Sequence, residues 1–178
     1  MIEEVLSFWF EESGPEEWWN SDPRFDAAIR SRFGTLHDRA VRGELYAWRD
    51  TPQGRLAEII VLDQFSRNLY RDDPRAFAAD GMALALAQEA VRTGADQAVS
   101  PDRRRFFYMP YEHSESAGIH EAAIPLFESL DEPETLDFEM RHKAIIDRFG
   151  RYPHRNRVLG RPSTEEEIAF LREPGSSF

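Results

Sequence analysis

Apolar residues recur every three or four positions along most of the chain, which is the spacing of an amphipathic α-helix. Phe25, Ile29 and Phe33 form one such face. The same spacing begins near Val5 and returns in residues 56–70, 82–91, 116–130 and 138–149. No stretch alternates apolar and polar positions with β-branched residues, as a half-buried strand would. The pattern therefore predicts an all-α fold.

Capping residues, prolines and glycines predict where the helices begin and end. A capping residue stands before each of four prolines, a combination typical of helix starts: Asp22-Pro23, Thr51-Pro52, Asp73-Pro74 and Ser100-Pro101. Residues 163–166 have the pattern of a capping box opening a last helix. The helix ends are expected at Gly43, Gly94 and Gly150. Pro110 is expected to break its helix, and Pro125 to kink one or to start another.

These boundaries predict about eight helices in antiparallel pairs, joined by short connectors within a single domain over residues 1–178. Residues 174–178 are expected to be a tail, although Phe178 could also dock. The chain has no internal repeat or low-complexity linker that would divide it.

Composition excludes several classes of chemistry. The chain has no cysteine, which excludes disulfides, thiol nucleophiles, Cys-ligated zinc and iron–sulfur clusters. The acidic residues 1–4 lack the basic charge of a signal peptide. No apolar run approaches the ~20 residues of a membrane span. We therefore expect a cytoplasmic protein with no membrane association and no cofactor or metal.

The charge of the chain is unevenly distributed. The net charge of −11 repels phosphate backbones, which argues against nucleic-acid binding. Residues 141–161 nevertheless hold seven Arg or Lys and one acid, a local charge of +6 that leaves −17 for the rest. This segment is expected to pair with acids of the fold, to bind an anion, or both. Only Lys143 is a lysine, so base composition accounts for part of the arginine content.

A polar stripe is expected on the helix between Pro52 and Arg71. Its second half places four polar residues on one side: Asp63, Gln64, Arg67 and Asn68. Leu62, Phe65 and Leu69 hold the other side to the core. One interpretation is a solvated face with an Asp63–Arg67 ion pair. The other is a stripe that lines a groove.

The segment 149–161 is predicted to be a polar loop, because it contains Pro153 and two glycines. Loops with dense polar groups beside a rigid scaffold often carry function. Arginine side chains here could hold a carboxylate or phosphate by forked hydrogen bonds. The residues concerned are Arg151, His154, Arg155, Asn156 and Arg161. The alternative is a loop braced by the protein's own acids.

The remaining candidate groups are histidines and acids. His113 and Glu115 follow Pro110 and could serve an acid–base or metal site, but they have no His-Glu-x-x-His spacing. His142 shares a face with apolar residues, which favours a buried, hydrogen-bonded histidine. The run 103–108 combines three arginines with aromatic residues. It is expected to be a helix with one charged side and one core side.

Three motifs together resemble a known family. They are Val-Leu-Asp-Gln-Phe-Ser-Arg-Asn at 61–68, Met-Pro-Tyr-Glu-His-Ser-Glu at 109–115 and Phe-Gly-Arg-Tyr-Pro-His-Arg-Asn at 149–156, followed by Leu-Gly-Arg at 159–161. The chain is similar over nearly its whole length to domain of unknown function family 924, an uncharacterised and largely bacterial family. The resemblance implies a tetratricopeptide-repeat-like all-α fold with a concave face. It also implies that the three motifs contribute to one group of residues. It implies no activity.

Three hypotheses of function follow. The first is a binding domain for a small anionic ligand or an acidic peptide group. Its site would contain Asp63, Gln64, Arg67, Asn68, His113, Glu115, Arg151, His154, Arg155, Asn156 and Arg161. The second is a hydrolase-type enzyme that uses His113, Glu115, His142 and His154 as acid–base groups. The third is a scaffold whose motifs form an internal polar network. The sequence is also compatible with a homo-oligomer.

Overall fold

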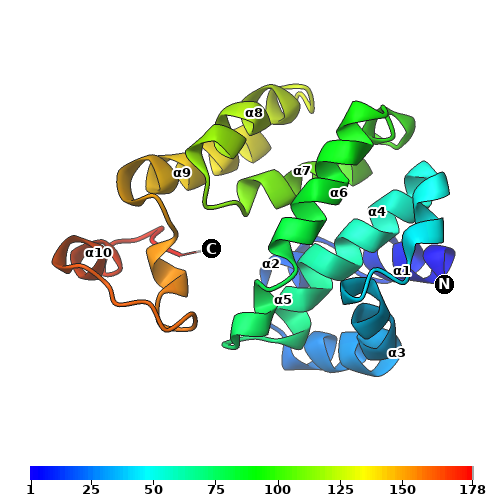
Figure 1. Cartoon of the computed structure of the whole chain (residues 1–178), viewed down its shortest axis with the longest axis horizontal. Coiled ribbons are helices and arrows are strands. Elements are labelled where there is room, and N and C mark those ends of the chain that lie inside the picture. The colour runs from blue at the N-terminus through cyan, green and yellow to red at the C-terminus, as the bar shows by residue number, and fades with distance from the viewer. Residues whose placement is uncertain (178) are drawn as a thin grey trace. The chain divides into compact units, whose positions relative to one another are not determined.

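The structure is a computed structural model that describes residues 1–177, and the prediction about Phe178 lies outside these residues. Every regular element of the described residues is helical, so the predicted all-α class is confirmed (Figure 1). The α-helices are α1 (Ile2–Phe10), α2 (Pro15–Trp19), α3 (Pro23–Val41), α4 (Pro52–Ile60), α5 (Ser66–Leu69), α6 (Asp80–Arg92), α7 (Pro101–Glu112), α8 (Ala117–Glu128), α9 (Pro133–Phe149) and α10 (Glu165–Phe170). Short 3₁₀ turns lie at Tyr46–Asp50, Pro74–Ala76, Asp96–Ala98 and Pro153–Arg155.

The chain divides into two compact units, which are described separately below. Unit 1 comprises Met1–Arg71 and Arg75–Pro110, and unit 2 comprises Asp72–Pro74 and Tyr111–Phe178. The single domain predicted from length stays a prediction. Among residues 1–177 no helix combines the length and apolar character that crossing a membrane requires.

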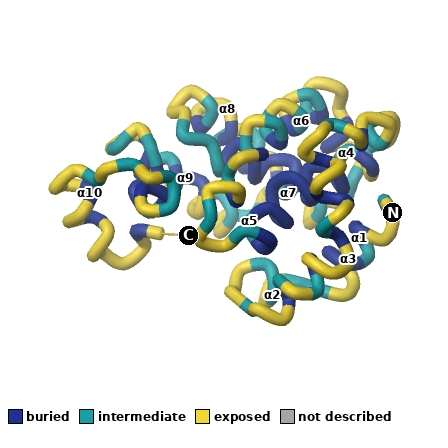
Figure 2. Tube along the Cα trace, turned by 60° about the horizontal axis from the view of Figure 1, so that its bottom comes forward, coloured by how far each residue is buried: buried dark blue, intermediate teal, exposed yellow. Residues whose placement is uncertain are grey.

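The core of unit 1 is aromatic. Phe8 stacks on Phe25 with 5.4 Å between ring centroids and meets Phe33 at 5.1 Å. Trp9 meets Phe106 edge-on at 5.8 Å, which joins α1 to α7. Each such pair contributes about 0.5–1.5 kcal/mol beyond the burial of its area. Helix α7 is half-buried at its three arginines, 103–105, and buried on every side from Phe106 to Glu112 (Figure 2), so its charged and core parts follow one another along the helix, and the prediction of a charged side and a core side is wrong.

Two of the predicted helix starts are confirmed by their caps. The Asp22 carboxylate accepts a hydrogen bond from the Arg24 N–H at 2.8 Å. The Thr51 hydroxyl accepts one from the Gly54 N–H at 3.1 Å. Gly54 is also needed for space, because a Cβ there would lie 2.0 Å from the Trp48 carbonyl oxygen. The backbone N–H groups at these ends therefore have local partners.

Three predicted boundaries are wrong. Pro110 does not break its helix, since α7 continues to Glu112 and a proline this close to the end removes few helical bonds. The Asp73-Pro74 pair begins only a 3₁₀ turn. The capping box is formed one residue later than predicted, by Thr164 and Glu167. The box begins at Thr164 because Arg151 holds the Glu167 carboxylate, and the third position of the helix therefore falls on Glu167 and not on Glu166.

The helix predicted from Pro52 to Arg71 contains a π-helical segment. Residues Val61–Phe65 form this wider turn between α4 and α5. Leu62, Phe65 and Leu69 are buried as predicted. The polar stripe is also buried, since Asp63 is only 1% exposed, so the solvated-face interpretation is wrong. The Asp63–Arg67 ion pair within it is confirmed at 3.3 Å.

Unit 2 is built on the packing of α8 against α9. Its apolar core contains Ile145, Ile146, Tyr152 and Phe170, with Phe149 packed against it. Helix α9 ends at Gly150, whose left-handed φ of 69° confirms the predicted stop. The chain then turns directly into the 149–161 segment. Within the predicted tail, Ser176 is buried and donates a hydrogen bond to the Leu171 carbonyl.

Candidate functional site

The structure places the predicted site residues in both units. Asp63, Gln64, Arg67 and Asn68 belong to unit 1. The other predicted site residues belong to unit 2: His113, Glu115, Arg151, His154, Arg155, Asn156 and Arg161.

In unit 1 the π-helical turn carries a short chain of polar contacts. The Gln64 side-chain amide donates to the Asp63 carboxylate at 2.6 Å. Arg67 donates to the Asp63 carbonyl oxygen at 2.8 Å and to both carboxylate oxygens of Asp80, at 3.0 and 3.1 Å. Isolated π-turns occur often at functional sites. Here the turn holds Asp63 and Gln64 buried and ties this helix to the start of α6.

Asn68 contributes to a different feature, a hollow of about 470 Å³ in unit 1. The hollow is lined by Pro23, Asp26, Ala27, Arg30, Ser31, Asn68, Leu69 and Arg71. The Asn68 side-chain amide donates to the Asp26 carboxylate at 2.8 Å. Of these lining residues, the sequence hypotheses named only Asn68 as part of a site.

In unit 2 the Glu115 carboxylate joins the central motif to the last one. It accepts two hydrogen bonds from Arg161, at 2.6 and 2.9 Å, and one from the Tyr152 N–H at 2.7 Å. Burial acts to raise the pKa of Glu115. The hydrogen bonds from Arg161 and Tyr152 outweigh this, so the pKa is lowered and the carboxylate stays ionised.

A second guanidinium–carboxylate pair fixes the start of the loop. Arg151 donates from Nε and Nη2 to the two oxygens of Glu167, at 2.7 and 2.8 Å. Glu167 is 2% exposed and also accepts the Thr164 N–H at 2.7 Å. The hydrogen bond from Arg151 is the main reason that the pKa of Glu167 is lowered to about 2. This forked pair ties the loop to α10.

Asn156 connects these two pairs. It is 1% exposed, its amide donates to the Ser163 hydroxyl at 3.1 Å, and its side-chain oxygen accepts from Arg161 Nε at 2.9 Å. Its backbone carbonyl accepts the Arg161 N–H at 2.8 Å. The loop predicted from Phe149 to Arg161 is therefore closed on itself by side-chain and backbone bonds.

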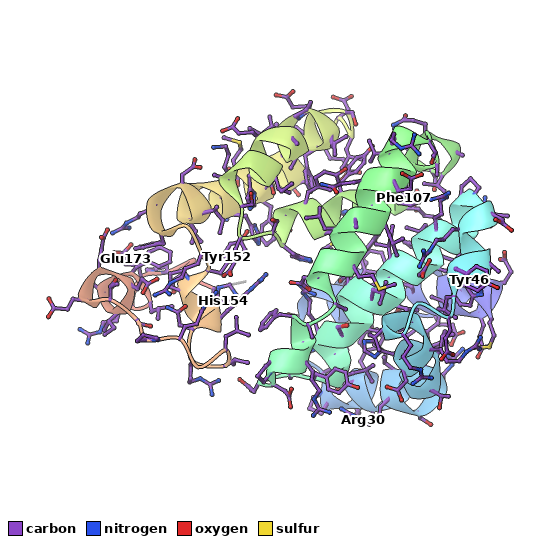
Figure 3. All side chains as sticks on the ribbon, in the orientation of Figure 1. Arg30, Tyr46, Phe107, Tyr152, His154 and Glu173 are labelled. Atoms are coloured by element: carbon purple, nitrogen blue, oxygen red, sulfur yellow. The ribbon has the colours of Figure 1, made fainter. Side chains whose placement is uncertain are left out.

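Tyr152 is the buried centre of the segment. Its hydroxyl donates to the Glu112 carbonyl at 2.5 Å, and the Arg155 guanidinium lies 4.6 Å from the centre of its ring. The His142, His154 and His120 rings lie 5.7, 5.6 and 6.4 Å from the tyrosine ring. Burial raises the pKa of the Tyr152 hydroxyl, which therefore acts as a neutral donor. Figure 3 labels Tyr152 and His154 on the segment that follows α9.

The predicted role of His142 as a buried core histidine is confirmed. It is 3% exposed, and its Nδ1–H donates to the Phe138 carbonyl at 2.9 Å. Its Nε2 lies 3.9 Å from the Glu112 carboxylate. Burial lowers the pKa of His142 to about 2, so the ring is neutral at physiological pH. His113 and His154 are only partly buried, and the His113 carbonyl accepts a hydrogen bond from Arg155 at 3.1 Å.

The hypotheses from the sequence did not include one buried pair, His120 and Glu139. Both side chains are fully buried, and His120 Nδ1 lies 2.7 Å from the Glu139 carboxylate. His120 Nε2 donates to the Ser114 carbonyl at 2.8 Å. Burial raises the pKa of Glu139. The two residues lie on α8 and α9, so no local spacing indicates that they meet.

These contacts limit what the cluster can do chemically. A general acid or base needs a pKa near the working pH. The hydrogen bonds that lower the pKa of Glu115 and the burial that lowers the pKa of His142 make both groups less suited to that role. Among the described residues, no three His, Asp or Glu side chains are grouped to hold a metal ion.

Comparison with known proteins agrees with the motifs. The comparison with curated proteins gave no match. A solved structure of a protein of unknown function from Agrobacterium tumefaciens, ATU0120, is similar, with 38% sequence identity, 96% of each chain covered and a TM-score of 0.92. The family model described as "Bacterial protein of unknown function (DUF924)" matches residues 5–175. The chain therefore belongs to the DUF924 family of bacterial proteins of unknown function.

Proposed function

We propose that the chain is a helical binding domain for a small anionic ligand, and that unit 2 contacts this ligand through His113, His154 and Arg155. The observation that carries the proposal is the arrangement around Tyr152. A guanidinium lies over its ring, and the partly exposed His154 ring lies beside it. Arg155 also bonds the backbone of the partly exposed His113. Two groups that can carry positive charge, Arg155 and His154, therefore lie beside one ring, and the same guanidinium bonds the His113 backbone.

The surrounding network supports the proposal by holding these groups in position. Glu115, Arg151, Asn156 and Arg161 are positioning residues, because their forked bonds fix both ends of the loop. A site whose side chains are fixed before binding loses less conformational entropy when the ligand arrives. The predicted role of Asp63, Gln64 and Arg67 in ligand binding stays a prediction, as does the concave tetratricopeptide-like face.

The test is a thermal-shift measurement with inorganic phosphate, citrate and a short acidic peptide at constant ionic strength. We expect at least one anion to raise the Tm of the unaltered chain, and His154→Gln or Arg155→Gln to reduce that rise. Arg157→Gln is the matched control, because Arg157 lies in the same loop with a side chain 78% exposed. If the Arg155→Gln variant does not fold, the thermal shifts of the His113→Gln and His154→Gln variants still test the proposal. No shift with any anion would sink the proposal.

A structural role is the second candidate, and a specific observation favours it. Six basic residues of segment 141–161 each pair with a carboxylate within unit 2: Asp137, Asp147, Glu166, Glu167, Asp72 and Glu115. The local charge of +6 is therefore largely balanced inside the fold. Under this alternative, substitutions at Arg151 or Asn156 lower the Tm and no anion restores it.

A further inference from the structure

The hollow in unit 1 is bounded by one face of α3 and by the end of α5. Pro23, Asp26, Ala27, Arg30 and Ser31 follow helical spacing, so their side chains share one side of α3. Asn68, Leu69 and Arg71 complete the lining. Helices α3 and α5 pack against each other (Figure 1). The volume of about 470 Å³ lies in the range of small-molecule sites.

Arg30 is held at the edge of the hollow by a single hydrogen bond. Its Nη2 donates to the Leu69 carbonyl, one of the carbonyls left open at the end of α5. The Nε–H and Nη1 groups make no hydrogen bond to any residue from 1 to 177. Figure 3 labels Arg30 at α3. This guanidinium is thus fixed at one nitrogen and keeps donors for another acceptor.

Arg71 makes more hydrogen bonds than Arg30, but some of its N–H donors also stay open. The Asp26 carboxylate accepts from Arg71 Nε at 2.5 Å and from Nη2 at 2.9 Å. Asn68 donates to the same carboxylate and steadies it. Within the described part of the chain, Arg71 Nη1 makes no hydrogen bond. The guanidinium is therefore pre-positioned with its Nη1 amino group to offer.

The charge of the lining favours a negatively charged ligand. Two guanidinium groups and one carboxylate give the hollow a net charge of +1. Because the chain as a whole carries −11 and the lining only +1, a ligand with a single negative charge suits this hollow. Pro23, Ala27 and Leu69 supply apolar atoms for an uncharged body. The planar fork of arginine matches the two oxygens of a carboxylate.

We propose that this hollow is a second binding site, separate from the site proposed in unit 2, and that it binds a small organic monocarboxylate through Arg30 and Arg71. The carboxylate accepts from the open donors of the two arginines. The apolar part of the ligand lies against Pro23, Ala27 and Leu69. Asp26 and Asn68 act as positioning residues, because they hold the Arg71 guanidinium.

The experiment is a titration of the full ¹⁵N-labelled chain with sodium benzoate, followed by NMR at constant ionic strength. Benzamide serves as the uncharged ligand of the same shape, and inorganic phosphate as the anion without an apolar body. We expect benzoate to shift the Asn68 side-chain amide and the backbone signals of Ala27 and Arg30, with a Kd in the millimolar range, ~1–10 mM. Benzamide and phosphate should bind about tenfold more weakly, since each lacks one of the two features.

Matched substitutions identify the residues responsible. Arg30→Met and Arg71→Met should each weaken benzoate binding about tenfold or more. Arg39→Met is the control, because Arg39 lies on the same helix outside the hollow and its side chain is 47% exposed. If Arg71→Met does not fold, Arg30→Met decides alone. Equal binding of benzoate and benzamide, or unchanged benzoate binding by Arg30→Met, would overturn the inference.

Different results would contradict the proposed site in unit 2 and the proposed site in the hollow. His154→Gln should leave the benzoate shifts at Asn68 unchanged, since His154 is not part of the lining. If benzoate instead shifts the signals of His113 and His154 and none at Asn68, the hollow is not its site. That result would support the site in unit 2.

Discussion

Arg161 in unit 2 and Arg30 in unit 1 carry the same guanidinium group but use its donors very differently. Arg161 bonds Asn156, both oxygens of Glu115 and the Tyr152 carbonyl, at 2.6 to 3.1 Å. Arg30 bonds one carbonyl and is exposed. A guanidinium whose donors are satisfied inside the fold holds that fold together, whereas one with open donors at a hollow can receive a ligand. The basic character of a segment alone does not distinguish the two.

The largest effect that would test this comparison is expected at Arg151. Arg151→Met leaves the Glu167 carboxylate, 3% exposed, without its main partner. We expect the largest loss in the free energy of unfolding among the substitutions proposed for this chain, measured by urea denaturation at pH 7. The double substitution Arg151→Met with Glu167→Leu should recover the part that comes from the unpaired buried charge, while the bond from the Thr164 N–H to Glu167 stays lost.

The pH dependence of the Arg151 effect has a defined sign. The pKa of Glu167 is lowered from 4.5 to about 2 in the folded chain. The contribution of the pair is therefore present above pH 4.5 and is lost as the pH falls toward 2. A cost of Arg151→Met that stays constant across this range would contradict the role given to the pair.

His142 should make unit 2 sensitive to acid. Its folded pKa of about 2 lies below the ordinary 6.5, so the unfolded chain binds the proton first. Stability from this residue is kept above pH 6.5 and lost as the pH falls, at about 1.4 kcal/mol per pH unit. His142→Gln should flatten the slope of unfolding free energy between pH 6.5 and 5 by about that amount, measured in urea. An unchanged slope would show that protonation of His142 does not cause the loss of stability in acid.

His37 offers a comparison in unit 1. It is 4% exposed, its Nε2 lies 2.8 Å from the Ser66 hydroxyl, and burial lowers its pKa as well. His37→Gln should flatten the acid dependence in the same direction. The two substitutions together then report how acid sensitivity is divided between the units.

A smaller effect is expected at the hollow. Arg30→Met removes one hydrogen bond, to the Leu69 carbonyl, and should cost about 1 kcal/mol or less of unfolding free energy. The measurement is the same urea denaturation, with Arg39→Met beside it. A loss as large as that of Arg151→Met would break the comparison, because Arg30 would then be as structural as the arginines of unit 2.

The smallest effect is expected at Arg157, which pairs with Asp72 on the surface. Their side chains are 78% and 75% exposed, so solvent screens the pair. Arg157→Gln should change the unfolding free energy by less than about 0.5 kcal/mol. A larger loss would mean that sequence position in the basic segment, rather than burial of the partner, decides the role of an arginine.

Part of the candidate site was predictable from the sequence because it depends on local pattern. The helical spacing around His142 indicated a buried histidine, and Gly150 marked the end of its helix. The π-turn at Val61–Phe65 was not indicated, because its residues fit an ordinary helix equally well. The hollow was missed since α3 looks like any amphipathic helix until α5 packs beside it.

By itself, the sequence determined the all-α class and the starts of α3, α4 and α7, because periodicity and capping act over a few residues. Only the tertiary structure decided which acid pairs with each arginine. Arg161 and Glu115 lie 46 positions apart, and 33 acidic residues were available in the chain. Electrostatic pairing depends on distance in space and on burial, and neither is encoded in local spacing. The same reason explains why one arginine becomes part of the fold and another remains open to a ligand.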